Sequence, residues 1–247
     1  MLRLGLLAGL VVAASAIGAL TLWDRTRPET NLPQSASAVK AERLLFLGTS
    51  LTEWYDWPAD TQRLLEGCIG QKIGAEVIAR GGQTSRWGLQ VLTERIRHGL
   101  PSPDLVVVEF AVNDADPRLG VSLSESMENH RKILTSLREL APESGILFLG
   151  MYAGHGLRGA LRARYGAYVA QVADLAKSDP AAGYLDMTHL WSAAYRSEGR
   201  SILPDGLHPD IVAARRLNAP AIARALGQMT GIPCEAHSAA NTGKMSR

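Results

Sequence analysis

The sequence predicts an α/β protein in which a five-stranded, mostly parallel sheet lies between two layers of helices. From about residue 41 to residue 227, short apolar runs alternate with stretches of helical spacing, and most of the runs are apolar throughout. Continuous apolar runs are typical of strands that are covered on both faces. Strands that alternate with helices favour a doubly wound, three-layer sandwich.

Five segments have the composition of buried strands. They are Leu44–Leu47, Ala75–Ala79, Leu105–Phe110, Ile146–Met151 and Tyr184–Met187. In doubly wound sheets the ligand crevice lies beyond the carboxyl ends of the strands. Polar residues that directly follow these runs are therefore the first candidates for chemistry.

Amphipathic helices are predicted between the strands. One follows a Ser122-x-x-Glu125 capping box, and its apolar face consists of Leu123, Met127, Leu134 and Leu137. A second has the same spacing in Leu161, Tyr165, Val169 and Val172. A last helix is predicted to begin near Pro209, and Pro220 within it is expected to kink or interrupt it.

The composition is that of a globular protein. The chain has 247 residues, of which 46% are hydrophobic and 20% are charged. A net charge of +2, with no cluster of Lys and Arg interleaved with aromatic residues, argues against a nucleic-acid partner. No His-Glu-x-x-His motif and no glycine-rich nucleotide loop after the first strand occur, so neither a metal nor a cofactor is expected.

The N-terminus predicts export. Residues 4–23 carry no charge and follow Arg3, which is typical of a signal peptide or a membrane anchor. The run is about long enough to span a bilayer, while Ala14-Ser15-Ala16 resembles a signal-peptidase site. Both alternatives place the rest of the chain outside the cytoplasm, in the periplasm or the extracellular space, with membrane attachment in the second.

The chain divides into four predicted parts. Residues 1–23 are the signal peptide or anchor, residues 24–40 a polar linker, residues 41–229 the folded domain, and residues 230–247 a C-terminal tail. The only cysteines are Cys68 and Cys234, which are too few for a four-thiolate zinc site. In an oxidising compartment they could pair and join the tail to an early helix; two unpaired buried cysteines are the alternative.

Ser50 is the candidate nucleophile, because it follows the first predicted strand in the segment Gly48-Thr49-Ser50. A serine hydroxyl needs a base, and His208 suits that role. Asp205, three residues earlier, can orient and stabilise the imidazole. The Ser50 and Gly82 N–H groups and the Asn113 amide, which follow the first three strands, could bind an oxyanion.

These segments resemble the four blocks of the SGNH or GDSL-type serine hydrolases, in the same order, over about residues 44–226. The blocks are Gly48–Leu51, the segment around Gly82, Ala111–Asp114 and Asp205–His208. The resemblance implies a flavodoxin-like fold, with Ser50, Asp205 and His208 as the catalytic triad and Gly82 and Asn113 as oxyanion donors. Two positions depart from the family pattern: Thr49 replaces the usual acid, and Ala111 replaces a glycine.

The resemblance therefore implies a metal-free esterase that passes through an acyl-enzyme, and the predicted export favours small acyl esters such as acetyl groups on a glycan. The alternatives are an O-acyltransferase that uses the same triad on a glycan acceptor, and a thioesterase or a lysophospholipase, the last of which would act on a lipid ester. Trp54 and Trp57 could line an acyl pocket, form a sugar platform or pack against the sheet. The histidines outside the triad are expected to be surface or core residues, with His155 the one considered for substrate contact: His98, His130, His155 and His189.

Overall fold

The computed structural model describes residues 28–33, 41–232 and 234. Its sheet has five parallel strands in the order β2-β1-β3-β4-β5. The strands are β1 (Arg43–Gly48), β2 (Gly74–Ala79), β3 (Leu105–Glu109), β4 (Gly145–Gly150) and β5 (Ala182–Asp186). The prediction of a five-stranded, mostly parallel α/β sheet is confirmed, and each strand lies within two residues of its predicted bounds.

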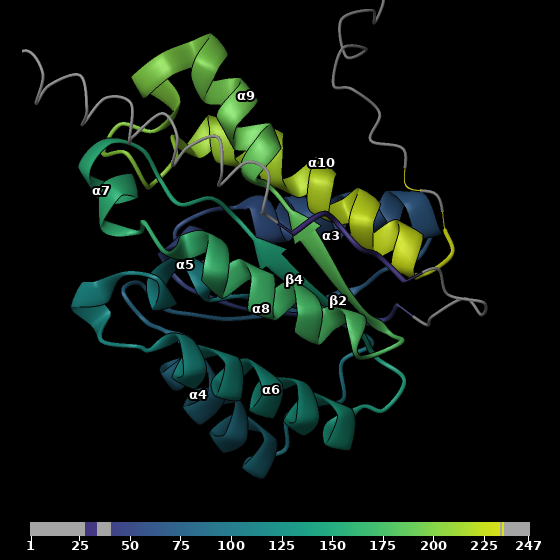
Figure 1. The fold of residues 1–247 in the computed structure, drawn as a ribbon. Helices are drawn as coiled ribbons and strands as arrows, with labels where there is room; N and C mark the ends of the chain where they lie inside the picture. Colours follow the sequence, from purple (N-terminus) through teal and green to yellow (C-terminus); the bar gives the residue numbers. More distant parts are fainter. Residues whose placement is uncertain (1–27, 34–40, 233, 235–247) are drawn as a thin grey trace, which may run out of the picture.

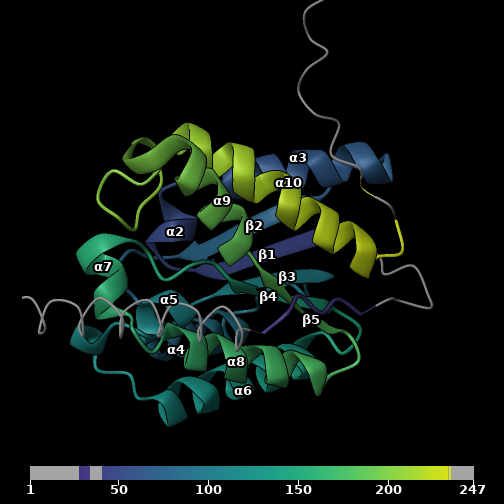
Figure 2. The ribbon, with the colours of Figure 1, turned by 45° about the horizontal axis from the view of Figure 1, so that its top comes forward.

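Helices cover both faces of the sheet, as Figures 1 and 2 show. On one face α3 (Trp57–Ile69) packs against α10 (Ile211–Met229), and α9 (Thr188–Glu198) lies beside them. On the other face α6 (Leu123–Leu140) packs between α4 (Ser85–Arg97) and α8 (Tyr165–Lys177).

Burial on both faces explains the apolar strand sequences. Every residue of β3 and of β4 is buried. Helix α4 approaches β3 so closely at Gly88 that a Cβ there would lie 2.4 Å from the Phe110 ring. The capping box before α6 is half formed, because Ser122 Oγ accepts the Glu125 N–H while the Glu125 carboxylate pairs with Arg86.

Short helical segments are found in the connections of the chain. They are α2 (Ser50–Glu53), α5 (Ala111–Asp114), η1 (Pro117–Leu119), α7 (Gly156–Leu161) and η2 (Gly199–Ile202). Of these, α2, α5 and α7 follow the carboxyl ends of β1, β3 and β4. In Figure 2, α2, α5 and α7 gather at one end of the sheet. The strand order reverses direction between β1 and β3, and a ligand crevice forms at such a switch point.

Two helix predictions need correction. The predicted face from Leu161 to Val172 spans two helices, because the chain breaks after α7 and begins again at α8. At this break Arg162 turns its side chain inward, and it is buried. The last helix starts at Ile211, within two residues of its predicted start near Pro209, and Asp210 is its N-cap. It is one continuous helix through Pro220, so the expected interruption does not occur, while the alternative of a kink stays a prediction.

The first described segment, residues 28–33, and the last described residue, Cys234, both contact the folded domain. Asn31 forms an antiparallel bridge with Tyr184 of β5, and Cys234 forms a disulfide with Cys68 of α3. Helix α10 also contacts α3 through an ion pair between Arg215 and Asp60. The predicted signal peptide or anchor, most of the linker and most of the tail lie outside the described residues. None of the helices in the described ranges has the length and hydropathy of a membrane span.

Candidate active site

Ser50 lies at the N-terminus of α2, directly after β1. Thr49 is the N-cap residue, and its Oγ1 accepts the Leu51 N–H at 3.3 Å. Gly48 allows the chain to turn here, because a Cβ at that position would lie 2.2 Å from Thr52 Oγ1. The turn therefore depends on a glycine, and it presents Ser50 at the carboxyl edge of the sheet.

Ser50 begins a chain of hydrogen bonds that includes both other predicted triad residues. Its Oγ lies 2.9 Å from His208 Nε2, and His208 Nδ1 lies 2.8 Å from Asp205 Oδ2. Asp205 Oδ1 accepts the backbone N–H groups of Leu207 and His208. The structure thus brings together three residues that are up to 158 positions apart in the sequence.

Asp205 is held in its ionised form. Burial raises its pKa, but the hydrogen bonds from the His208 ring and from the backbone of His208 and Leu207 outweigh burial and lower the pKa to about 2. Arg158 of α7 adds an ion pair, with its Nη2 3.1 Å from Asp205 Oδ2. An ionised carboxylate can hold the imidazole in one orientation and stabilise its protonated form.

The loop that carries Asp205 and His208 is fixed by backbone contacts. The Tyr152 hydroxyl donates to the Leu207 carbonyl at 2.5 Å, and the His155 N–H donates to the Gly206 carbonyl at 2.6 Å. Beyond the histidine, the Tyr55 hydroxyl donates to the Pro209 carbonyl at 3.0 Å. These contacts come from the segments that follow β4 and α2, so the loop is held from two sides.

Asn113 and Gly82 lie in neighbouring segments at the same edge of the sheet. Asn113 belongs to α5, and its Nδ2 donates to the Gln83 carbonyl at 2.8 Å. An amide nitrogen has two hydrogens, so one remains for another acceptor. Gly82 has a φ of 72°, a conformation that favours glycine. Helix α5 is anchored by Asp114, which accepts hydrogen bonds from the Ser85 N–H and the Ser126 hydroxyl.

The model of the GDSL-like Lipase/Acylhydrolase family matches residues 46–215. The protein belongs to this family. It is therefore a carboxylic ester hydrolase, as the four sequence blocks imply. A comparison with curated proteins found no match.

Several solved structures share the fold of this GDSL-like hydrolase. LAE5, an alpha/beta hydrolase enzyme from the metagenome of Lake Arreo in Spain, has a TM-score of 0.62 at 19% identity, covering 79% of this chain and 98% of that one. A lipase/acylhydrolase from Enterococcus faecalis has a TM-score of 0.61 at 19% identity, covering 79% and 99%. Axe2, an acetylxylan esterase from Geobacillus stearothermophilus, has a TM-score of 0.60 at 18% identity, covering 81% and 100%.

The two tryptophans that follow the serine of this GDSL-like hydrolase have different surroundings. Trp57 is fully buried, and its Nε1 donates to the Leu51 carbonyl, so it belongs to the core. Trp54 is 56% exposed, and its ring centroid lies 4.7 Å from that of His208. Its indole also lies against Gly81, where a Cβ would be 2.8 Å from the ring. Of the two, only Trp54 is available to a substrate.

Sequence reasoning missed a buried acid beneath residues 48–52 of this GDSL-like hydrolase, here called the nucleophile turn because it carries the candidate nucleophile Ser50. Glu109 ends β3, is 1% exposed, and accepts hydrogen bonds from the Thr49 N–H and from the Thr49 and Thr52 hydroxyls. Burial raises its pKa to about 7, against the lowering effect of these hydrogen bonds. The available signal was an acid inside an otherwise apolar run. The Arg158 contact with Asp205 had no sequence signal.

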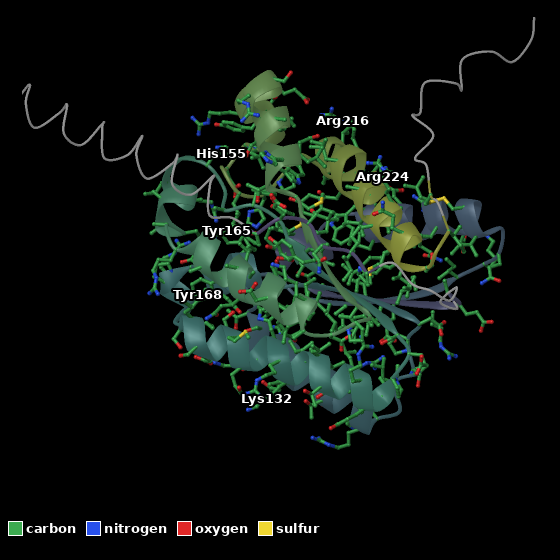
Figure 3. The ribbon with its side chains drawn as sticks, turned by 45° about the vertical axis from the view of Figure 1, so that its right-hand side comes forward. Lys132, His155, Tyr165, Tyr168, Arg216 and Arg224 are labelled. Atoms are coloured by element: carbon green, nitrogen blue, oxygen red, sulfur yellow. A yellow bond between two sulfur atoms is a disulfide. The ribbon has the colours of Figure 1, made fainter. Side chains whose placement is uncertain are left out.

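The remaining histidines are distributed as expected from the sequence. His98 and His189 are exposed and His130 is buried in the core. His155 is half-buried beside α9, as Figure 3 shows, and its ring stacks on that of Tyr195. Within the described ranges, no group of three or more potential metal ligands is arranged to hold an ion.

Proposed function

We propose that this hydrolase is an exported serine esterase in which Ser50, His208 and Asp205 form the catalytic triad. The observation that carries the proposal is the hydrogen-bonded chain from Ser50 Oγ through both ring nitrogens of His208 to Asp205. A nucleophile, a base and an orienting carboxylate in contact are the arrangement that acyl transfer to serine requires.

In the first half of the reaction, Ser50 Oγ attacks the ester carbonyl carbon while His208 Nε2 accepts its proton. Asp205 stabilises the resulting imidazolium, and it keeps its own negative charge because its pKa is held near 2. The imidazolium then donates this proton to the departing alcohol oxygen. The products of this half are the free alcohol and an ester of Ser50.

The tetrahedral intermediate places a negative charge on the former carbonyl oxygen. The proposed donors to this oxygen are the N–H groups of Ser50 and Gly82 and the second N–H of the Asn113 amide. The bond to the Gln83 carbonyl supports this role, because it orients the Asn113 amide before substrate binds. In the second half, His208 Nε2 takes a proton from water as the water oxygen attacks the acyl-enzyme carbonyl carbon. The bond between that carbon and Ser50 Oγ then breaks, Oγ takes the proton back from His208, and the carboxylic acid is released.

The test is the Ser50→Ala variant together with a fluorophosphonate probe. Loss of a triad member costs several orders of magnitude in turnover, so Ser50→Ala is expected to lose esterase activity. The probe should label Ser50 in the wild-type protein and leave the variant unlabelled. An active variant, or labelling at another residue, would show that the nucleophile is misassigned.

For the substrate, we propose a small acyl ester, such as acetyl, on a glycan. The exposed indole of Trp54 beside His208 supports a carbohydrate alcohol, because aromatic faces bind the apolar faces of sugar rings. The fold shared with Axe2 agrees with this proposal. A series of p-nitrophenyl esters from acetate to palmitate tests the acyl part, and kcat/KM should be highest for acetate. A maximum at long chains would favour a lipid ester instead.

Export is proposed from the charge-free N-terminal run, and the Cys68–Cys234 disulfide supports it, because disulfides persist in oxidising compartments. Cell fractionation tests the proposal. A mature protein that begins near Ile17 in the soluble envelope fraction would indicate a cleaved signal peptide. The full-length chain in the membrane fraction would indicate an anchor, and a cytoplasmic pool would refute both.

A further inference from the structure

Glu109 is a buried carboxyl group that has no cationic partner among the described residues. Three acids are buried in the described part of the chain: Glu109, Asp114 and Asp116. Asp116 pairs with two arginines, and Asp114 lies 3.9 Å from His130 Nδ1, but no ion pair in that part includes Glu109. Burying an ionised carboxyl group without a nearby cation lowers the free energy of unfolding, because the charge loses its hydration and gains no ion pair. The four residues that precede Glu109 in β3 are apolar and buried, so an apolar side chain at position 109 would fit the strand better.

All the hydrogen bonds of this carboxyl group come from the nucleophile turn. Glu109 Oε2 accepts the Thr49 N–H at 3.1 Å, the Thr49 hydroxyl at 2.8 Å and the Thr52 hydroxyl at 3.3 Å. Its other oxygen, Oε1, is buried with no hydrogen-bond partner among the described residues. One carboxylate oxygen from β3 therefore contacts residues on both sides of Ser50.

The nucleophile turn needs such an anchor. Helix α2 is a single turn of four residues, and so short a helix is unstable in isolation. Gly48 has no side chain, which leaves room for the Thr52 hydroxyl to lie over the backbone and reach Glu109 Oε2. Once Thr49 and Thr52 are held, the direction of the intervening Ser50 side chain is restricted.

We propose that Glu109 is a positioning residue for the nucleophile: by accepting hydrogen bonds from Thr49 and Thr52, it aims Ser50 Oγ at His208 Nε2. It has no hydrogen bond with Ser50 or His208 and acts through the turn alone. A displacement of about 1 Å of a reacting group can cost about 100-fold in rate. The inference rests on the proposed function, because it assigns a role in orienting the Ser50 nucleophile.

The first test compares Glu109→Leu with Glu109→Gln. Leucine suits the buried strand but leaves the Thr49 and Thr52 donors unpaired, so the variant should stay folded with a lowered melting temperature. Its kcat should fall by about 10- to 100-fold, with KM changed less than about threefold. Glutamine can place its amide oxygen where Oε2 lies and should keep kcat within about threefold of the wild-type value. The rate of fluorophosphonate labelling of Ser50 should follow kcat in both variants.

Thr49 provides a matched pair of control variants. Thr49→Ser keeps the hydroxyl and should behave as the wild type, whereas Thr49→Val should lose activity as Glu109→Leu does. The double variant Glu109→Leu/Thr52→Val should be hardly worse than Glu109→Leu alone, because the hydroxyl that Thr52→Val removes donates to Glu109 Oε2, a contact that Glu109→Leu has already broken. Losses that multiply in the double variant would show that the two residues act independently and would overturn the proposal.

Three other results would also overturn it. A folded Glu109→Leu variant with wild-type kcat would show that the turn needs no anchor. A raised KM with unchanged kcat would indicate substrate contact, and a glutamine variant as slow as the leucine variant would show that hydrogen bonding is not the role of Glu109. Failure of the proposed function is recognised separately, because Ser50→Ala would then remain active.

Discussion

At the scale of single residues, the Asn113 amide donates one hydrogen to the Gln83 carbonyl, and its proposed role requires the other to face the substrate. The replacement Asn113→Ala removes the proposed oxyanion donor, and we expect kcat to fall by about 10²- to 10³-fold while KM changes little. Steady-state kinetics with p-nitrophenyl acetate measures both. The nearly isosteric Asn113→Asp variant keeps the shape but lacks the donor, so it should be as slow; an active aspartate variant would contradict the assignment.

Trp54 is expected to contribute to binding of the alcohol part of the substrate. Trp54→Ala should raise KM for an acetylated xylo-oligosaccharide by about fivefold to tenfold, which corresponds to about 1 kcal/mol of lost contact. Its KM for p-nitrophenyl acetate, which has no sugar, should stay near the wild-type value, and Trp54→Phe should keep most of the glycan binding. An equal rise in KM for both substrates would indicate that Trp54 packs against His208 and does not bind the sugar.

Several residues of the site could be predicted because the chemistry limits the choice of side chains. A serine, a histidine and an acid that follow strand ends or lie in one loop were recognisable, and the structure places Ser50, His208 and Asp205 in contact. Glu109 and Arg158 could not be assigned to the site, because their partners lie 60 and 47 positions away in the sequence and depend on the fold. The sequence could not distinguish the roles of Trp54 and Trp57, because they differ in burial: Trp57 lies in the core and Trp54 is exposed.

At the scale of elements, Arg162 joins two of the short helices that form the site. It is only 2% exposed, its Nε donates to the Val112 carbonyl of α5, and its Nη1 donates to the Arg158 carbonyl of α7. Its Nη2 also lies 2.9 Å from Asp116 Oδ2. Arg162 therefore connects the helix that carries Asn113 to the helix that carries Arg158, which pairs with Asp205.

The replacement Arg162→Met should lower the free energy of unfolding by about 3 kcal/mol, because it leaves buried acceptors of α5 and α7 without their donor. Arg118→Met is the matched control, since Arg118 binds the same carboxylate of Asp116 but is largely exposed. The control should cost less than about 1 kcal/mol. Urea unfolding of both variants measures the difference, and equal losses would contradict the role given to Arg162.

Arg162 also explains why one helix prediction failed. The apolar spacing from Leu161 to Val172 continues without interruption in the sequence, but a buried arginine with three acceptors fixes a turn between α7 and α8. Helix α10 shows the opposite case. Pro220 lacks an N–H, yet packing of α10 against α3 and the sheet keeps the helix continuous. Tertiary contacts, which the local sequence does not reveal, decided both outcomes.

At the scale of the whole molecule, Glu109 makes stability depend on pH. Its pKa rises from 4.5 to about 7 on folding, mainly through burial, while the hydrogen bonds from the two threonines oppose this rise and Asp114 adds to it. The nearby Tyr152 and Tyr165 stay neutral, because burial raises their pKa values further. Between pH 4.5 and 7 the folded state binds more protons at Glu109 than the unfolded state, so this group lowers stability as pH rises.

We therefore expect the difference in stability between Glu109→Gln and the wild type to increase from pH 4.5 to pH 7 by about 3 kcal/mol in favour of the variant, and to level off above that. Chemical denaturation at several pH values measures this difference. Other groups, such as Asp205, titrate alike in both proteins and cancel. A difference that does not change with pH would show that Glu109 keeps an ordinary pKa.

The disulfide between Cys68 and Cys234 joins the segments on either side of the site. Cys68 lies in the helix that follows Ser50, and Cys234 lies beyond the helix that follows His208. A single proteolytic cut anywhere between residues 70 and 204 would therefore leave the serine fragment and the histidine fragment covalently linked. Such a nicked enzyme should migrate as one band on a non-reducing gel and as two after reduction, and the link would hold both halves of the proposed triad in one molecule.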